Sequence, residues 1–329
     1  MRGKTLAGLA LAAAGSAWAQ AAPPVIGWVP PYAMNESMQA LEATPGVGSA
    51  LTRIGLQFWN PSADGKGVVF APVDKSGRQV IADDVRRFRD WARRRHIAVL
   101  LTVYNNSQVI GHWDWALARH AFVDQRADFT QALVAEMEKH QLDGIDLDLE
   151  GEGDFTPDRE AYALFVDVLS RILKAKGKLL TVDSFHSPCA NAPNMSWWRD
   201  WAGRVDAIHS MGYADLYEGS IERFAPAGQP ACEGGAPIFK YSWQLQYGLK
   251  AGYRVDQIVL GLPTWVDSWG SGGQGPAVLS HLNEVRELGA GVALWDLQLS
   301  APGWRAPETW DAVRALRERP GTGWQRLQP

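Results

Sequence analysis

Three acidic residues stand at every second position in the segment LDGIDLDLEGEGD, which covers residues 142–154. They are Asp146, Asp148 and Glu150, and aliphatic residues lie between them. Because successive side chains of a β-strand point to opposite faces, the three carboxyl groups share one face. Neighbouring negative charge and burial both raise the pKa of a carboxyl group. We therefore expect Glu150 to stay protonated near neutral pH and to act as a general acid, with Asp146 and Asp148 sharing one proton.

Two other interpretations of this acidic segment are open. A row of carboxylates could bind Mg²⁺ or Ca²⁺, although such sites generally take oxygen ligands from several segments of a chain. An exposed edge strand could also alternate acidic and aliphatic residues. The regular succession of strands and helices around the segment favours a buried strand instead.

The elements that must position these carboxyl groups alternate along the chain. Apolar runs with the length of strands recur, and amphipathic segments such as residues 157–177 lie between several of them. Eight strands alternating with helices predict a parallel sheet, and eight units of this length favour a single closed (β/α)8 TIM barrel. The expected strands begin near Val25, Leu51, Ile97, Leu142, Lys178, Val205, Gln257 and Gly291.

A barrel gives the acidic strand a direction. The outward face of a barrel strand meets the helices, so Ile145, Leu147 and Leu149 should point outward and the acids inward. Glu150 then lies at the carboxyl end of the fourth strand, where barrel enzymes have their active sites. The GxGxxG motif of dinucleotide-binding proteins does not follow the first expected strand. We expect no cofactor and no metal ion.

Length and charge restrict the possible partners. The 329 residues suit one large domain, and a hydrophobic fraction of 46% is enough to form a sizeable core. The formal net charge is −4, and the sequence has no basic block. This argues against nucleic acid or an anionic membrane surface as a partner. We expect a monomer.

Residues 1–19 have the features of a secretory signal peptide, which would leave residues 20–329 as the catalytic barrel. A positively charged start, a short apolar run and the small residues Ala17 and Ala19 are typical of such a signal. A membrane anchor is the alternative, but the apolar run is too short to span a bilayer. We expect the mature protein to be secreted or periplasmic.

The chain has two cysteines, Cys189 and Cys232. In an oxidising compartment they can form a disulfide bond, and the expected strands place both in loops after neighbouring strands. Two unpaired buried thiols are the alternative.

The segment from Asp143 to Glu150 resembles the DGxDxDxE signature of glycoside hydrolase family 18, the chitinase family. The resemblance implies that Glu150 protonates the glycosidic oxygen, while the 2-acetamido group of the substrate attacks the anomeric carbon and the reaction proceeds with retention. It also implies that Asp148 binds the acetamido nitrogen and that Asp146 exchanges a proton with Asp148. The expected substrates are β-1,4-linked glycans that contain N-acetylglucosamine, with chitin and its oligosaccharides first.

The sixth expected strand adds to this resemblance. Its end, HSMGYAD, is similar to the family's Met-x-Tyr-Asp motif, with Met211 and Tyr213 in the matching positions. In the family the tyrosine binds the acetamido carbonyl, so Tyr213 takes that role by resemblance; a core tyrosine is the alternative. The family's aspartate is replaced by Ala214, and Asp215 could substitute for it.

Other candidate substrate-binding residues lie at the ends of further strands. Trp295 resembles the tryptophan that forms the floor of the family's sugar site, and a flat indole suits the apolar face of a sugar. Trp59 and Trp265 are expected platforms at the ends of the second and seventh strands, although each could be a core residue. Where the family has Ser-x-Gly-Gly, this chain has bulkier groups, among them Tyr104 and Asn105, so the cleft beside the reacting sugar should differ.

Several functions fit these residues. An endo-β-N-acetylglucosaminidase or a peptidoglycan hydrolase would use the same chemistry as a chitinase. A non-catalytic sugar-binding barrel is a further alternative, but such relatives usually lack the terminal glutamate that Glu150 supplies. A metal-dependent phosphodiesterase would need carboxylates or histidines from several strand ends, which are mostly aromatic or apolar here.

Overall fold

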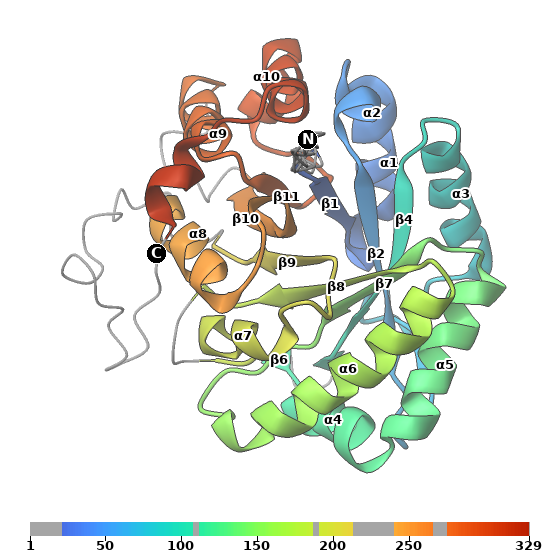
Figure 1. Cartoon of the computed structure of the whole chain (residues 1–329). Coiled ribbons are helices and arrows are strands. Elements are labelled where there is room, and N and C mark those ends of the chain that lie inside the picture. The colour runs from blue at the N-terminus through green and yellow to red at the C-terminus, as the bar shows by residue number, and fades with distance from the viewer. Residues whose placement is uncertain (1–21, 108–111, 187–190, 213–239, 266–274, 329) are drawn as a thin grey trace, which may run out of the picture.

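The computed structural model describes residues 22–107, 112–186, 191–212, 240–265 and 275–328. Its central element is a parallel sheet in which each strand pairs with the next, and the first strand also pairs with the last. The sheet is thereby closed into a (β/α)8 barrel, which confirms the predicted fold (Figure 1). The barrel strands are β1 (Val25–Val29), β2 (Arg53–Pro61), β4 (Ala98–Tyr104), β7 (Gly144–Asp148), β8 (Leu179–Ser184), β9 (Ala207–Ser210), β10 (Ile258–Pro263) and β11 (Gly291–Trp295).

In the part of the chain that the structure describes, three short strands lie outside this parallel barrel. Strand β3 (Val68–Phe70) pairs antiparallel with the end of β2. Strands β5 (Asn106–Ser107) and β6 (His112–Trp113) pair with each other directly after β4. The hairpin of β5 and β6 therefore lies at the carboxyl end of the barrel.

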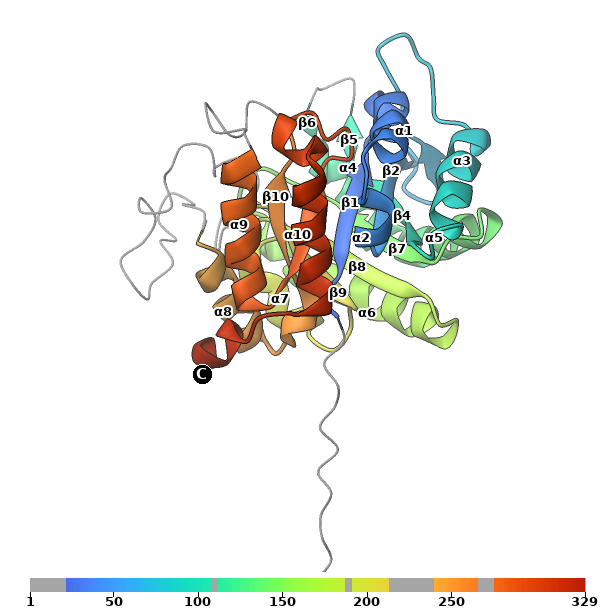
Figure 2. The same cartoon turned by 90° about the horizontal axis from the view of Figure 1, so that it is seen from above.

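The helices surround the barrel (Figure 1), and Figure 2 shows α9 and α10 side by side over β10 and β1. They are α1 (Met34–Ala43), α2 (Val47–Ala50), α3 (Ala82–Arg93), α4 (Trp115–Arg119), α5 (Arg126–Lys139), α6 (Arg159–Ala175), α7 (Trp198–Trp201), α8 (Tyr241–Ala251), α9 (Gly275–Leu288) and α10 (Pro307–Glu318). A π-turn covers His120–Asp124, and short 3₁₀ helices cover Pro31–Ala33, Thr156–Asp158, Met195–Trp197, Val255–Gln257, Pro302–Arg305 and Gly323–Leu327.

Helix α6 illustrates how the sequence specifies these elements. Its buried residues include Tyr162, Phe165, Val166 and Leu169, which recur at the spacing of one helical face. After the helix, Gly177 has a φ of 64°, a left-handed conformation that glycine adopts without strain. The apolar face of α6 packs against the sheet and closes the outer layer of the core.

The interior of the barrel is a second, smaller core. Its apolar members form a cluster separate from the one between sheet and helices. The indole of Trp28 can cross the interior because the neighbouring residue on β2 is Gly55: a Cβ atom there would lie 2.5 Å from Trp28 and 2.6 Å from the Thr102 hydroxyl. The inner cluster consists of Ile26, Trp28, Leu100, Ala207, Val259 and Ala293.

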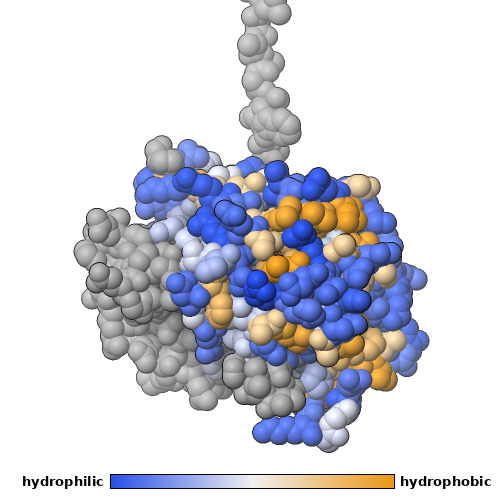
Figure 3. All heavy atoms as spheres, turned by 90° about the horizontal axis from the view of Figure 1, so that it is seen from below, coloured by the Kyte–Doolittle hydropathy of each residue, from blue (hydrophilic) through white to orange (hydrophobic). Residues whose placement is uncertain are grey.

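The surface is mainly polar where the structure describes it. The face in Figure 3 is largely hydrophilic, with hydrophobic residues in separate groups. Among the described residues, the large hydrophobic side chains that are exposed are Tyr32, Val69, Ile81 and Leu164. In the same part of the chain, we find no helix with both the length and the hydrophobicity needed to cross a membrane.

Candidate active site

The three acids of the β7 segment point into the barrel, as predicted. Asp146 is 0% exposed, Asp148 3% and Glu150 6%. The aliphatic residues between them belong to the outer core cluster, beneath the helices. Strand β7 ends at Asp148, so Glu150 follows it at the carboxyl end of the barrel. The alternation of the sequence thus places a row of carboxyl groups from the centre of the barrel to its mouth.

Asp146, the innermost acid, accepts hydrogen bonds from three neighbouring side chains and lies close to a histidine. Its Oδ2 accepts hydrogen bonds from Trp28 Nε1 at 2.8 Å and Thr102 Oγ1 at 3.0 Å. Its Oδ1 accepts one from the Thr181 hydroxyl and lies 3.4 Å from His209 Nδ1. Burial alone would raise the pKa of Asp146, but the hydrogen bond and positive charge of His209, with the other donors, outweigh it and lower the pKa.

Asp148 and Glu150 form a proton-sharing pair. The side chains are hydrogen-bonded to each other, and Gln57 Nε2 donates to Asp148 Oδ2 at 2.6 Å. Burial raises the pKa of Asp148 to about 7, and burial together with the charge of Asp148 raises the pKa of Glu150 well above its usual range. The shared proton therefore belongs to Asp148 and Glu150, and the expected sharing between Asp146 and Asp148 is wrong. The raised pKa of Glu150 is in the direction expected for an acid that stays protonated near neutral pH.

Asn105 fixes the main chain at Glu150. Its Nδ2 donates to the Glu150 carbonyl oxygen and its Oδ1 accepts from the Glu150 N–H, both at 2.7 Å. The side chain is completely buried, and both of its polar ends are engaged in these bonds. The expected role of Asn105 in substrate binding is therefore corrected: it is a clamp that orients the acid.

Aromatic residues surround the carboxyl pair. Tyr104, at the end of β4, is buried, and burial followed by the charge of Asp148 raises the pKa of its hydroxyl. Its ring lies edge-to-face with Trp113 at 6.4 Å between centroids. Trp295, at the end of β11, is half-buried and lies 6.2 Å from the ring of Trp28. Trp265 is also half-buried. Substrate binding by Tyr104, Trp265 and Trp295 stays a prediction.

Trp59 lies on the other side of the sheet. A register shift between Leu56 and Trp59 turns the end of β2, so that Gln57 points inward and the indole packs toward α5. There Trp59 Nε1 donates to Glu136 at 3.2 Å, and the ring lies 5.8 Å from that of His140. Because Trp59 is 0% exposed, the expected sugar platform at this position is wrong.

Four of the predicted residues cannot be compared with the structure. Tyr213, Asp215, Cys189 and Cys232 fall outside the described residues. Met211 is half-buried just after β9, and its N–H donates to the Ser184 carbonyl oxygen at 2.9 Å. The start of the Met-x-Tyr motif is thereby tied to the end of β8.

Several polar residues of the site were missed by our sequence reasoning. They are inward-facing side chains of other barrel strands, and they contact the β7 acids directly or through one neighbour. The same alternation that marks β7 is present in these strands and could have identified them, as in TVDS from Thr181 and AIHS from Ala207. The missed residues are Trp28, Gln57, Thr102, Thr181, Asp183 and His209.

One group of possible metal ligands occurs among the described residues, and it belongs to this site. Asp146, Asp183 and His209 are all buried, and their ligand atoms lie within 4.8 Å of one another. However, His209 Nδ1 is 2.7 Å from Asp183 Oδ1, which is a hydrogen-bond distance. The arrangement is that of a hydrogen-bonded network.

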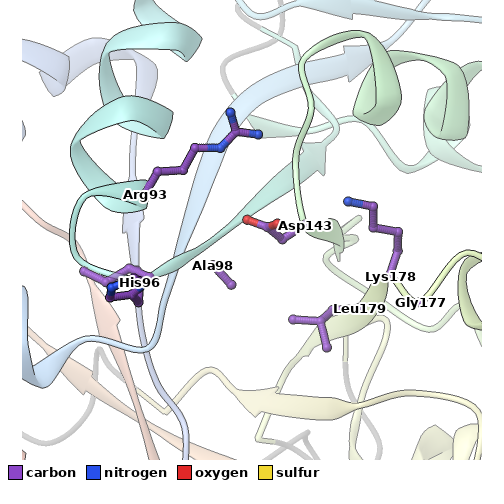
Figure 4. Close-up of a pocket in the computed structure, with 8 residues that line it drawn as sticks. Arg93, His96, Ala98, Asp143, Gly177, Lys178 and Leu179 are labelled. Carbon is purple, nitrogen blue, oxygen red and sulfur yellow. The ribbon is translucent and has the colours of Figure 1, made fainter.

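A separate pocket lies at the opposite end of the barrel, where β4, β7 and β8 begin. It has a volume of about 420 Å³, and Figure 4 shows Asp143 in it between Arg93 and Lys178. Arg93 donates to the Gln141 carbonyl oxygen at 2.8 Å and Lys178 to that of Leu142 at 2.7 Å. These side chains bind the main chain at the amino ends of the strands, remote from the catalytic end of a barrel.

Comparison with known proteins identifies the family. The model of the glycosyl hydrolases family 18 matches residues 50–311. The chain belongs to this family. No curated protein sequence matches it significantly.

Solved structures of family 18 enzymes and of related hydrolases have the same fold. A chitinase from Bacteroides thetaiotaomicron is 18% identical, with a TM-score of 0.65 over 91% of this chain and 97% of that one. A chitinase from Chromobacterium violaceum is 19% identical, with a TM-score of 0.62 over 90% and 99% of the two chains. The spore cortex-lytic enzyme SleL of Bacillus cereus is 15% identical, with a TM-score of 0.62 over 89% of this chain and 74% of that one.

Proposed function

We propose that the protein is a retaining glycoside hydrolase that cleaves β-1,4 bonds following an N-acetylglucosamine unit, with the acetamido group of the substrate as nucleophile. The observation that carries this proposal is the buried pair of Asp148 and Glu150 at the mouth of the barrel, with one proton held between two carboxyl groups. A protonated acid at neutral pH is what cleavage of a glycosidic bond requires.

In the first step, Glu150 donates its proton to the glycosidic oxygen while the bond from the anomeric carbon to that oxygen breaks. The acetamido oxygen of the same sugar forms a new bond to the anomeric carbon, which gives a cyclic oxazolinium ion. Asp148, which is anionic while Glu150 holds the shared proton, accepts a hydrogen bond from the acetamido nitrogen and stabilises its positive charge. In the second step, water attacks the anomeric carbon while the bond from that carbon to the acetamido oxygen breaks, and the attacking water gives a proton to the Glu150 carboxylate.

The arrangement of the carboxyl groups favours the acetamido group over an enzyme nucleophile. A retaining enzyme with a carboxylate nucleophile holds its two carboxyl groups about 5–5.5 Å apart across the sugar. Here Asp148 is hydrogen-bonded to Glu150, so both carboxyl groups lie on the same side of the bond that breaks. Asp146 is enclosed by donors and cannot reach the substrate. The nucleophile must then come from the substrate itself.

Several N-acetylglucosamine polymers fit this chemistry. Chitin and chito-oligosaccharides are our first choice, since chitinases are frequent among the similar structures, one of them from Cycas revoluta in complex with (GlcNAc)3. The similarity to spore cortex-lytic enzymes favours peptidoglycan as the second choice. Parallel assays on chitotetraose, a muramyl glycan and an N-glycoprotein would distinguish chitinase, peptidoglycan hydrolase and endo-β-N-acetylglucosaminidase action.

We further propose that the protein is exported by its N-terminal signal and acts as a monomer without a metal ion. A disulfide between Cys189 and Cys232 is part of this proposal. Mass spectrometry of the exported protein would test the signal peptide by giving the mature N-terminus. The mass change on reduction and alkylation would test the disulfide.

The decisive experiment replaces Glu150 by Gln, which keeps the shape of the side chain and removes its acidic proton. We expect kcat on chitotetraose to fall by about 10³-fold, in the range found for general acids, while oligosaccharide binding is retained. Glu152→Gln is the matched control, because Glu152 is exposed two residues further along the same segment. Equal activity of the Glu150→Gln variant and the wild type would refute the proposal. Loss of wild-type activity on addition of EDTA would instead favour a metal-dependent hydrolase.

A further inference from the structure

We propose that His209, oriented by Asp183, is a positioning residue that occupies Asp146 and so leaves Asp148 to pair with Glu150. The proposal rests on the hydrolytic function inferred above. It assigns a role to two buried polar residues, on β8 and β9, that do not face the mouth of the barrel.

The hydrogen bonds around Asp146 carry the argument. A carboxylate has about four lone-pair positions. Two on Oδ2 are taken by Trp28 and Thr102, and one on Oδ1 is taken by Thr181. The fourth position is contacted by His209 Nδ1, 3.4 Å from Oδ1, and by the side chain of Asp183, which is hydrogen-bonded to Asp146. Asp146 therefore has no acceptor position left for a proton held by Asp148, and Asp148 is directed to Gln57 and Glu150 instead.

Asp183 fixes the position of His209. Its Oδ1 lies 2.7 Å from His209 Nδ1, and both side chains are buried. The ring of His209 also lies edge-to-face with Trp28, 5.1 Å between centroids, so that it is held from a second side. A rotation of the imidazole away from Asp146 would break both contacts. The ring is thus fixed with Nδ1 directed at the two carboxyl groups.

Acidic groups surround the pair of His209 and Asp183. Burial, followed by the negative charges of the β7 acids, raises the pKa of Asp183 well above its usual range, so the pair sits in a strongly negative interior. The titratable groups that face the pair, or that face Asp146 from other elements, are Asp146 and Asp148 on β7, Glu150 after it, Arg53 on β2, Asp206 and Asp256 beside Arg53, and Tyr162 on α6.

The test compares His209→Gln with the wild type in kcat and KM across a pH range. Without the Nδ1 contact, which lowers the pKa of Asp146, this carboxyl group takes up a proton more easily, so the acidic limb of the kcat profile should move up by about one pH unit. At the acidic edge of the profile, kcat should fall about tenfold with KM unchanged. Ser210→Ala is the matched control, because Ser210 is the next buried residue on β9 and bonds Gln244.

Two variants at Asp183 keep the test decisive if His209→Gln does not fold. Asp183→Asn retains an oxygen that can accept from His209 and should leave the profile close to that of the wild type. Asp183→Leu removes the acceptor and should reproduce the shift of the acidic limb. An unshifted limb in Asp183→Leu and in any folded His209 variant would overturn the proposal, since a merely structural role changes stability and not the profile.

A second readout does not depend on activity. In protein labelled with ¹³C at the aspartate carboxyl groups, the resonance of Asp146 should titrate at a higher pH in Asp183→Leu than in the wild type. If the wild type cleaves no tested glycan but the resonance shifts, the catalytic function fails and the positioning role stands. If the enzyme is active and the resonance does not move, the positioning role fails alone.

Discussion

At the amino end of the barrel, Asp143 and Asp206 accept hydrogen bonds from the main-chain N–H groups of Val99 and Leu180, at 2.9 and 2.8 Å. Each of these acids precedes its own strand and binds the start of the neighbouring one. Toward the carboxyl end, the acids that follow Asp143 on β7 are buried and bind side chains or one another. The same residue type thus joins strands at one end and holds protons at the other.

This difference shows how a barrel can separate stability from chemistry. At the amino end, partly buried carboxylates satisfy main-chain donors that would otherwise be unpaired. In the interior, desolvation raises the pKa of Asp148 and Glu150 and makes their ionised forms unfavourable. Substitutions at the two ends should therefore have opposite effects, and the following predictions test that contrast.

Among the substitutions that compare the two ends of the barrel, the largest effect is expected for Asp148→Asn. The amide carries no negative charge to stabilise the positive acetamido nitrogen, so we expect kcat to fall by about 10²–10³-fold. The basic limb of the pH profile should also move to lower pH, because the charge of Asp148 raises the pKa of Glu150. Asp143→Asn, at the other end of the same segment, is the control and should leave kcat unchanged. A similar loss in both variants would contradict the separation of roles.

How far the sequence predicts this site depends on which physical signal each residue carries. The barrel, the eight strands and the inward direction of the β7 acids follow from periodicity alone, because one face of each strand must meet the helices. Trp59 was misplaced because a register shift in β2 reverses its direction, and periodicity does not reveal such a shift. Asn105 was misassigned because its partner is the main chain of a residue 45 positions away.

The pH dependence of the unfolding free energy should reveal how unfavourable it is to ionise the buried acids Asp148 and Glu150. The folded-state pKa of Asp148 is about 7 and that of Glu150 is also raised, so their contribution to stability is fully present below the unfolded pKa of about 4. It is lost as pH rises toward and through the folded-state values, because the unfolded chain ionises first. Asp146 has a lowered pKa and contributes with the opposite sign.

Consequently, the double variant Asp148→Asn/Glu150→Gln should lose less stability between pH 5 and pH 8 than the wild type does. We expect a difference of roughly 2–4 kcal/mol in this change of unfolding free energy, measured by urea denaturation at both values. The Glu152→Gln variant should follow the wild type. Parallel curves of unfolding free energy against pH for the double variant and the wild type would show that folding does not raise the pKa of these two acids.

A smaller effect, on KM, should distinguish a tryptophan at the mouth of the barrel from one on the outer face of the sheet. Trp295 is half-buried at the carboxyl end, so Trp295→Ala should raise KM for chitotetraose about tenfold, or roughly 1.4 kcal/mol, through loss of an apolar sugar platform. Trp59→Phe, behind the sheet, should leave KM unchanged and only reduce stability, since it loses the bond to Glu136. A raised KM in Trp59→Phe would restore that residue to the substrate site.

The smallest effect is expected for Asp143→Ala, at the amino end. It leaves the N–H of Val99 without its side-chain partner and should lower the unfolding free energy by about 1 kcal/mol at pH 7. Because this carboxylate stabilises the strand start by accepting a hydrogen bond, its removal should destabilise, whereas removal of the Asp148 and Glu150 carboxyl groups should stabilise near pH 8. If Asp143→Ala instead raised the unfolding free energy and lowered kcat, the amino end would be part of the catalytic machinery and the contrast would fail.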